Sequence, residues 1–248
     1  MSGGKISGKE ELKRNLRHNF TDYRESHPKQ GDYQRASREY ETSLQMFEKL
    51  RDQAGIANTR RKLGDIHYLR GEHDAALHEY EASLRIGDQS GITFTRRTIG
   101  MIHQQRGDYE AALREYEASL RTFEKLGDQS GIAFTRHLLG NIHYGCGDYE
   151  AALREYAESL RIDEELGNKY GIAVSKGQIA LIHGQRKEYA AAFDSYFYAL
   201  TVLKQLQSPN AEIAFNWLRR LRKTWGADAF DAAWQQAAGE PVPDEMKE

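Results

Sequence analysis

An internal repeat of about 40 residues dominates the sequence. The segment GDYEAALREYEASLR at 107–121 recurs almost unchanged at 147–161, and in more divergent form at 31–45, 71–85 and 187–201. The copies begin at positions 31, 71, 107, 147 and 187, so their spacings are 40, 36, 40 and 40 residues. A second repeated block, IAFTRHLLGNIHYGC at 132–146, alternates with the first. Two alternating blocks per period predict a two-element unit that stacks on further copies of itself.

Both blocks have the periodicity of helices. Ile132, Leu139 and Ile142 share one helical face, and the same register is kept in the other copies. Asp148 stands where its side chain can cap a helix that begins near Tyr149. The copy with the 36-residue spacing lacks four residues at the end of its second block, which is about one helical turn. The repeat therefore predicts an all-α fold of stacked helical hairpins.

Small and aromatic residues alternate in fixed columns of this repeat. Small residues let two helices approach closely, and a large ring fills the space beside them. One small column is Gly64, Gly100, Gly140 and Ala180, a second begins with Ala36, and a third begins with Ser43. The aromatic column is Tyr40, Tyr80, Tyr116, Tyr156 and Tyr196.

These columns resemble the tetratricopeptide repeat (TPR) family over residues 31–206. The family pattern of Leu-Gly, an aromatic residue, Ala, an aromatic residue and a small residue is matched in one copy by Leu139, Gly140, His143, Ala152, Tyr156 and Ser159. The tryptophan column of the family is occupied here by Arg60, Arg96, Arg136 and Lys176, and the terminal proline is absent. Such departures and the longer period resemble the branch that includes kinesin light chain and bacterial scaffold and sensor proteins.

The resemblance implies a right-handed α-solenoid whose concave surface, lined by the first helices, binds a protein or peptide partner. The matching positions in the first three full copies are Asn58, Arg61, Asp65, Tyr68, Phe94, Arg97, Met101, Gln104, Phe134, His137, Asn141 and Tyr144. Arginines beside exposed Phe94 and Phe134 suit an extended or helical segment with apolar anchors and acidic residues. A local basic stripe of Arg61, Arg97 and His137 is expected within a chain whose net charge is only -2.

Two alternatives stay open at this point. The arginines of the first helices can instead pair with Glu or Asp of the neighbouring second helix. In function, the main hypothesis is a non-catalytic scaffold or adaptor that binds its partner in the groove. The alternative is a peptide-sensing regulatory protein that acts in trans through a ligand-induced change of solenoid curvature, and self-association is a further option.

Composition argues against several other classes of protein. The chain has 248 residues, 39% hydrophobic and 29% charged, with one cysteine and a mean hydropathy of -0.77. One cysteine cannot form an intramolecular disulfide, and the first ten residues contain no apolar run, so we expect a cytoplasmic protein without a signal peptide or membrane segment. The near-zero net charge does not favour nucleic acid as a partner.

No motif for catalysis, a cofactor or a metal is present. His67, His103, His143 and His183 form a column, but successive members are expected about 10 Å apart, too far to share a zinc ion. They are interpreted as packing residues. Cys146 is interpreted as a residue of a turn, and Asp88 and Asp128 as helix caps. The basic cluster Arg219, Arg220, Arg222 and Lys223 is interpreted as the solvated face of a capping helix.

The predicted organisation follows from where the repeat begins and degenerates. Residues 1–9 are expected to be flexible, 10–50 to form a degenerate N-terminal hairpin, 51–206 to form the TPR array, and 207–239 to form C-terminal capping helices. Pro241 and Pro243 predict a flexible tail over 240–248.

Overall fold

The computed structural model describes residues 30–87 and 91–247. Within these ranges all regular structure is helical, and no strand occurs. The helices are α2 (Gln30–Leu50), α3 (Gln53–Leu69), α4 (His73–Ile86), α5 (Ile92–Gln105), α6 (Tyr109–Leu126), α7 (Gln129–Gly145), α8 (Tyr149–Leu166), α9 (Lys169–Gln185), α10 (Tyr189–Gln205), α11 (Ala211–Trp225), α12 (Ala227–Ala238) and the 3-10 helix η2 (Asp244–Met246). Residues 1–9, residues 10–29 of the predicted N-terminal hairpin, and Asp88 lie outside the described residues.

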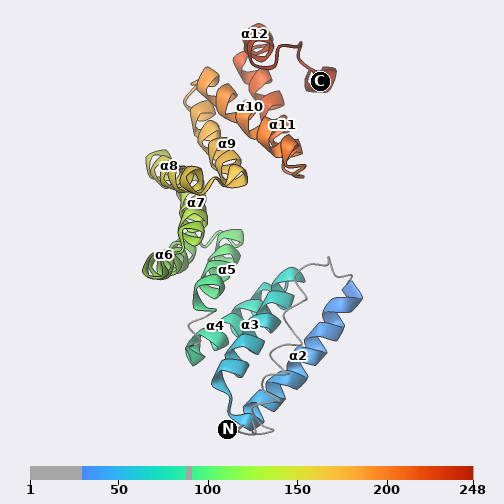
Figure 1. Ribbon diagram of the computed structural model, residues 1–248, viewed down its shortest axis with the longest axis vertical. Coiled ribbons are helices and arrows are strands. Elements are labelled where there is room, and N and C mark those ends of the chain that lie inside the picture. The colour runs from blue at the N-terminus through green and yellow to red at the C-terminus, as the bar shows by residue number, and fades with distance from the viewer. Residues whose placement is uncertain (1–29, 88–90, 248) are drawn as a thin grey trace, which may run out of the picture. The chain divides into compact units, whose positions relative to one another are not determined.

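The chain divides into two compact units, and the boundary between Ser119 and Leu120 falls inside α6. The first unit holds α2 to α5 and the start of α6, and the second holds the rest of the chain. Within each unit, helices pack on their neighbours in the sequence, as α3 does on α4 and α7 on α8 (Figure 1). Each repeat is therefore a helical hairpin, as the two alternating blocks predict.

Polar side chains at the helix starts explain where many hairpin helices begin. The carboxylates of Asp52, Asp128 and Asp148 each accept a hydrogen bond from the amide three residues later, which satisfies one of the free donors of the first turn. The prediction that Asp128 is a cap is confirmed. At the other end of α8, Gly167 adopts a left-handed backbone with φ of 67°, which lets the chain turn directly into α9.

The glycine and tyrosine columns pack against each other within each hairpin. Cβ atoms added to Gly64, Gly100 and Gly140 would lie 2.5 to 2.6 Å from the rings of the tyrosines sixteen residues later, Tyr80, Tyr116 and Tyr156. These three tyrosines are 0 to 1% exposed. Only glycine leaves room for the ring on the first helix, so the two columns together set the separation of the paired helices.

The hairpin with the shorter spacing keeps the same core. Its second helix, α4, has 14 residues, whereas α8 has 18, so the missing residues shorten one end of the helix. The buried hydroxyl of Ser83 donates to the carbonyl of Ala57 at 2.8 Å. Ser119 makes the matching bond to Thr93 at 3.0 Å in the next hairpin. A deletion of about one turn therefore leaves the contacts between the helices unchanged.

The C-terminal helices close the apolar core of the second unit. Leu218 of α11 and Phe230 of α12 are fully buried against α10 residues such as Phe193. Residues 240–247, where the sequence predicts a loose tail, also contribute buried side chains, with Val242 4% and Met246 1% exposed. The two apolar side chains anchor this segment to the same core, which the prolines alone did not indicate.

Candidate partner-binding surface

The groove positions of the first unit lie on α3 and α5, and none of them is fully buried. Phe94 is 44% exposed. Of the eight positions on these two helices, Phe94 is exposed and the other seven are half-buried.

A hydrogen-bonded polar cluster occupies the α3 part of this surface. Nη2 of Arg61 donates to Oδ1 of Asn58 at 2.6 Å, and Nη1 of Arg61 lies 3.5 Å from Oδ2 of Asp65. Nζ of Lys62 lies 3.7 Å from the same carboxylate oxygen. Asp65 therefore neutralises part of the positive charge and fixes the direction of both cationic side chains.

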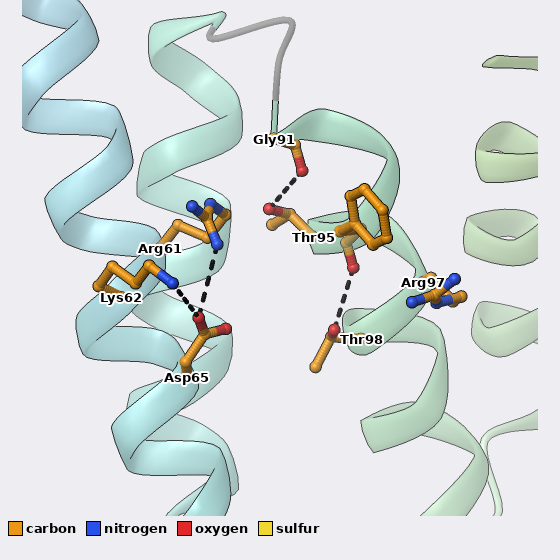
Figure 2. A pocket seen from close by; sticks show the side chains of 8 residues that line it. Arg61, Lys62, Asp65, Gly91, Thr95, Arg97 and Thr98 are labelled. Carbon is orange, nitrogen blue, oxygen red and sulfur yellow. Dashed lines mark hydrogen bonds and ion pairs between the residues drawn. The ribbon is translucent and has the colours of Figure 1, made fainter. Parts of the chain in front are cut away.

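A notch of about 260 Å³ separates this cluster from the start of α5 (Figure 2). Arg61, Lys62 and Asp65 lie on its α3 side, and Thr95 and Thr98 on its α5 side. The hydroxyls of both threonines donate to carbonyls one turn earlier in the chain, so they line the notch without presenting free donors. With Arg97, the lining carries three cationic side chains and one carboxylate, so the notch has a positive potential.

Arg97 is placed differently from Arg61. Its guanidinium carbon stands 4.9 Å from the centroid of the Phe94 ring, a cation–π arrangement on a single helix. In Figure 2 its side chain lies on the side of α5 away from Arg61 and Lys62. Phe94 and Arg97 together present an apolar face beside a charged group, the combination expected of an anchor for a partner's side chain.

The buried tyrosines reach several groove positions with their hydroxyls. Tyr80 donates to Asp65 at 2.9 Å, Tyr116 to Gln104 at 2.8 Å, and Tyr156 to Asn141 at 2.8 Å. Burial raises the pKa of Tyr80, Tyr116 and Tyr156 above the ordinary value, so these hydroxyls stay protonated and act as donors.

Sequence reasoning missed this link. It placed Asp65, Gln104 and Asn141 on a partner-facing surface, but their oxygens are already engaged by the core tyrosines. The sequence does contain a signal for these bonds, because each polar residue lies 12 or 15 positions before a tyrosine of the aromatic column. Met101 and Tyr68 are half-buried on the same helices as Arg97 and Arg61.

The groove positions of the second unit lie on α7. Phe134 is 44% exposed, like its counterpart Phe94. Asn141 and Tyr144 are half-buried, and the Tyr144 ring packs 5.6 Å from that of Tyr149. The two exposed phenylalanines thus occupy the same repeat position in separate units.

His137 does not extend the expected basic stripe. Its ring packs 5.4 Å from the ring of Tyr156, and its Nδ1 lies 3.5 Å from the hydroxyl of Ser175. Burial lowers the pKa of His137 to about 4, so the imidazole is neutral at pH 7. The stripe predicted from Arg61, Arg97 and His137 is therefore corrected to a positive patch on α3 and α5.

The neighbouring arginine column makes ion pairs inside each hairpin. Arg60, Arg96 and Arg136 pair with the glutamates nineteen residues later, Glu79, Glu115 and Glu155, at 3.0, 2.9 and 3.1 Å. In the last full hairpin Lys176 instead stands 5.0 Å from the ring centroid of Tyr198. The alternative of internal pairing holds for this column, whereas Arg61 and Arg97 lie one position further along the helix.

The histidine column and the α11 cluster have structural contacts. Nδ1 of His67 lies 2.6 Å from Glu72, and His183 makes the same contact with Glu188. In the described residues, no group of three His, Cys, Asp or Glu side chains could hold a metal ion. Arg222 of α11 makes two hydrogen bonds to Asp231 of α12, at 2.7 and 3.0 Å, which ties the two capping helices together.

Cys146 is an exposed residue at the end of α7, followed by Gly147 with φ of 80°. This geometry agrees with the interpretation of Cys146 as a residue of a turn. Across the part of the chain that the structure describes, no helix is long and apolar enough to cross a bilayer.

Comparison with known families decides the classification. The model of the tetratricopeptide repeat matches residues 26–89 and 92–165, more than half of the chain. The chain belongs to the tetratricopeptide repeat family. The resemblance inferred from the Gly, Ala and Tyr columns is therefore confirmed, and so is the solenoid fold of TPR hairpins. No curated protein matches this TPR chain.

Solved structures share the TPR fold at low sequence identity. The crystal structure of BtubC (BKLC) from P. vanneervenii shares 18% sequence identity with this chain. The match covers 85% of this chain and 94% of the BtubC chain, with a TM-score of 0.66. The apo form of RapI is 14% identical to this chain. The match covers 97% of this chain and 74% of the RapI chain, with a TM-score of 0.66. A chain of the APC/C hetero-tetramer Cut9–Hcn1 is 17% identical to this chain. The match covers 88% of this chain and 39% of the other chain, with a TM-score of 0.60.

Proposed function

We propose that this TPR protein is a non-catalytic scaffold that binds a segment of a protein partner on the exposed faces of its first helices. TPR proteins bind protein partners, and one structural relative, Cut9–Hcn1, is a hetero-tetramer. The observation that carries the proposal is the positive notch between α3 and α5, with Phe94 and Arg97 at its edge. A notch of this size accepts one side chain of a partner rather than a whole ligand.

The chemistry of the notch specifies the kind of segment. Arg61 and Lys62 are held in place by Asp65, so these side chains lose little further conformational entropy when a ligand binds. A carboxylate on the partner would make charge-assisted hydrogen bonds there. An adjacent apolar side chain would cover the exposed ring of Phe94, so the segment carries an acidic residue next to an apolar one.

The equivalent position in the second unit offers an apolar contact of its own. Phe134 is as exposed as Phe94, but its helix carries the neutral His137 where α5 carries Arg97. We therefore assign the acidic residues of the partner to the first unit and only apolar residues to α7. We place the protein in the cytoplasm, with Cys146 as a free thiol.

The test begins with capture of binding proteins from the native lysate and continues with isothermal titration of the captured partner. Arg97→Glu should reduce its affinity by about tenfold or more, because the reversed charge repels a carboxylate. Arg114→Glu, on the exposed face of α6, is the matched control for charge and should leave affinity unchanged. Circular dichroism should show that both variants are folded. Equal affinity for Arg97→Glu and the wild-type protein would exclude this surface.

A further inference from the structure

A second concave surface lies in the second unit, between α10 and α12. It is a notch of about 660 Å³ whose accessible aromatic side chain is the half-buried Trp225, which packs on the buried Phe193 with ring centroids 6.2 Å apart. Alanines from both helices, Ala190 and Ala229 among them, form its sides and are exposed. Asp194 is the single charged residue of its lining. The notch is therefore apolar and aromatic at its base and acidic at its edge.

The repeat shows that this surface departs from the rest of the array. On α6, Arg114 is exposed and pairs with Glu110 at 2.6 Å. The residue forty positions later is Arg154 on α8, but on α10 it is Asp194. The last full hairpin has thus exchanged a cation for an anion at this position of its outer face. Contact with the capping helices does not explain the exchange, because the side chain of Asp194 remains exposed.

Within the described part of the chain, Asp194 has no ion pair of the kind that Arg114 forms with Glu110. The residues three and four positions away on α10 are Ala190, Ala191, Phe197 and Tyr198, so no cation is available on its own helix. Among the residues that the structure describes, no salt bridge involves Asp194. A carboxylate without a cation beside an aromatic base is complementary to an ammonium or guanidinium group, which aromatic rings also attract.

The alanines define the shape of the occupant. Small side chains on α10 and α12 let another helix approach to about 8–10 Å between axes, so that its larger side chains reach Trp225. A helix supplies such side chains on one stripe and basic residues beside it. An extended strand would find no free backbone groups to pair with on these two helices.

We propose that the notch between α10 and α12 is a second docking site, which binds an amphipathic basic helix of a protein partner. One large apolar side chain of this helix packs on Trp225, and a Lys or Arg one turn away pairs with Asp194. The site is separate from the positive notch of α3 and α5 and prefers the opposite charge. The protein can thus hold an acidic segment on one unit and a basic helix on the other, which is the property of an adaptor.

The experiment uses the full chain and a fluorescein-labelled helical peptide of about 18 residues, long enough to form helix in isolation. The peptide carries Leu at helical intervals and Lys on either side of that stripe, and a second peptide has Glu in place of each Lys. Fluorescence anisotropy should show binding of the Lys peptide and at least about tenfold weaker binding of the Glu peptide.

Asp194→Arg restores the arginine found at this position in the copies that begin at 31, 107 and 147, so the variant should fold. It should lower the affinity for the Lys peptide by about tenfold or more. Arg154→Asp, which makes the reverse change at the equivalent position of α8, is the control and should leave the affinity unchanged. Because neither residue lies on α3 or α5, both variants should bind the groove partner normally, so the two proposals succeed or fail separately.

Three results would overturn the proposal. The first is no binding of the Lys peptide, or equally tight binding of the Glu peptide. The second is an affinity of Asp194→Arg within about twofold of the wild-type protein. The third is sedimentation of the chain as a dimer that Asp194→Arg dissociates, which would assign the notch to a second copy of this chain.

Discussion

The ring of Tyr156 occupies the space in which a side chain on Gly140 would stand. A Cβ atom at Gly140 would lie 2.5 Å from Cε1 of the ring, well inside contact distance. Tyr156 is also fully buried, and its hydroxyl is held by Asn141, so the ring cannot move aside. The pair therefore joins the packing of the hairpin to the proposed partner-binding surface.

Gly140→Ala is expected to destabilise the second unit. Overpacking costs about 1–3 kcal/mol, which exceeds the gain of about 1 kcal/mol from replacing a helical glycine with alanine. Urea denaturation followed by circular dichroism measures the change in the free energy of unfolding. Gly184→Ala on α9 is the control, because no atom lies within 4 Å of the added Cβ, and it should be neutral or stabilising. Equal destabilisation by both substitutions would contradict the packing argument.

The ion pair of Arg96 with Glu115 should contribute measurably to stability. The two side chains are 34% and 25% exposed, whereas those of the Arg114–Glu110 pair are 63% and 85% exposed. A double-mutant cycle with alanine should give a coupling energy of about 0.5–1 kcal/mol for Arg96–Glu115 and a smaller one for Arg114–Glu110. Both should decrease when salt is added. A larger coupling for the exposed pair would contradict this ranking.

His137 should remain neutral in the folded protein down to about pH 4. The unfolded chain protonates this ring near pH 6.5, so the unfolded state binds more protons between pH 6.5 and 4. Stability from the neutral ring is therefore present above pH 6.5 and is lost as pH falls toward 4. His137→Gln should reduce the slope of unfolding free energy against pH in this window. An NMR titration in which the chemical shift of the His137 ring carbon changes with a midpoint near pH 6.5 would contradict the lowered pKa.

Met246→Ala should destabilise the C-terminal part of the second unit. Met246 is 1% exposed and packs with Val242 in the core cluster that includes Leu218 and Phe230. Truncation of a fully buried methionine costs about 2–5 kcal/mol through lost burial and the cavity left behind. Thermal melting measures the effect, and Glu245→Ala, at an exposed neighbouring position, is the control. No change in melting temperature for Met246→Ala would show that the segment is as loose as its prolines predict.

The periodic residues explain why so much of the fold could be predicted. Gly140, Tyr156 and Asp148 recur at fixed intervals, and each acts within one hairpin, as a close contact, a buried ring or a helix cap. Such roles depend on spacing along the chain and on which face of a helix a residue occupies. The accessible placement of Phe94 and Phe134 follows from the same periodicity.

The partners of the polar residues depended on the tertiary structure. Arg60 and Arg61 are adjacent in the sequence, yet Arg60 pairs across the hairpin with Glu79, whereas Arg61 is held by Asn58 and Asp65 on its own helix. A rotation of about 100° separates successive residues on a helix, so neighbouring side chains meet different surroundings.

The sequence by itself therefore determined the helical repeat, the TPR hairpins and the residues that face the core, because these follow from local spacing. Only the tertiary structure decided that His137 is neutral, that Asp65 is engaged by Tyr80, and that Asp194 stands beside an apolar notch. Charge and hydrogen bonding at each of these residues depend on side chains brought from other helices. Burial and distance between helices, which the sequence does not state, set those interactions.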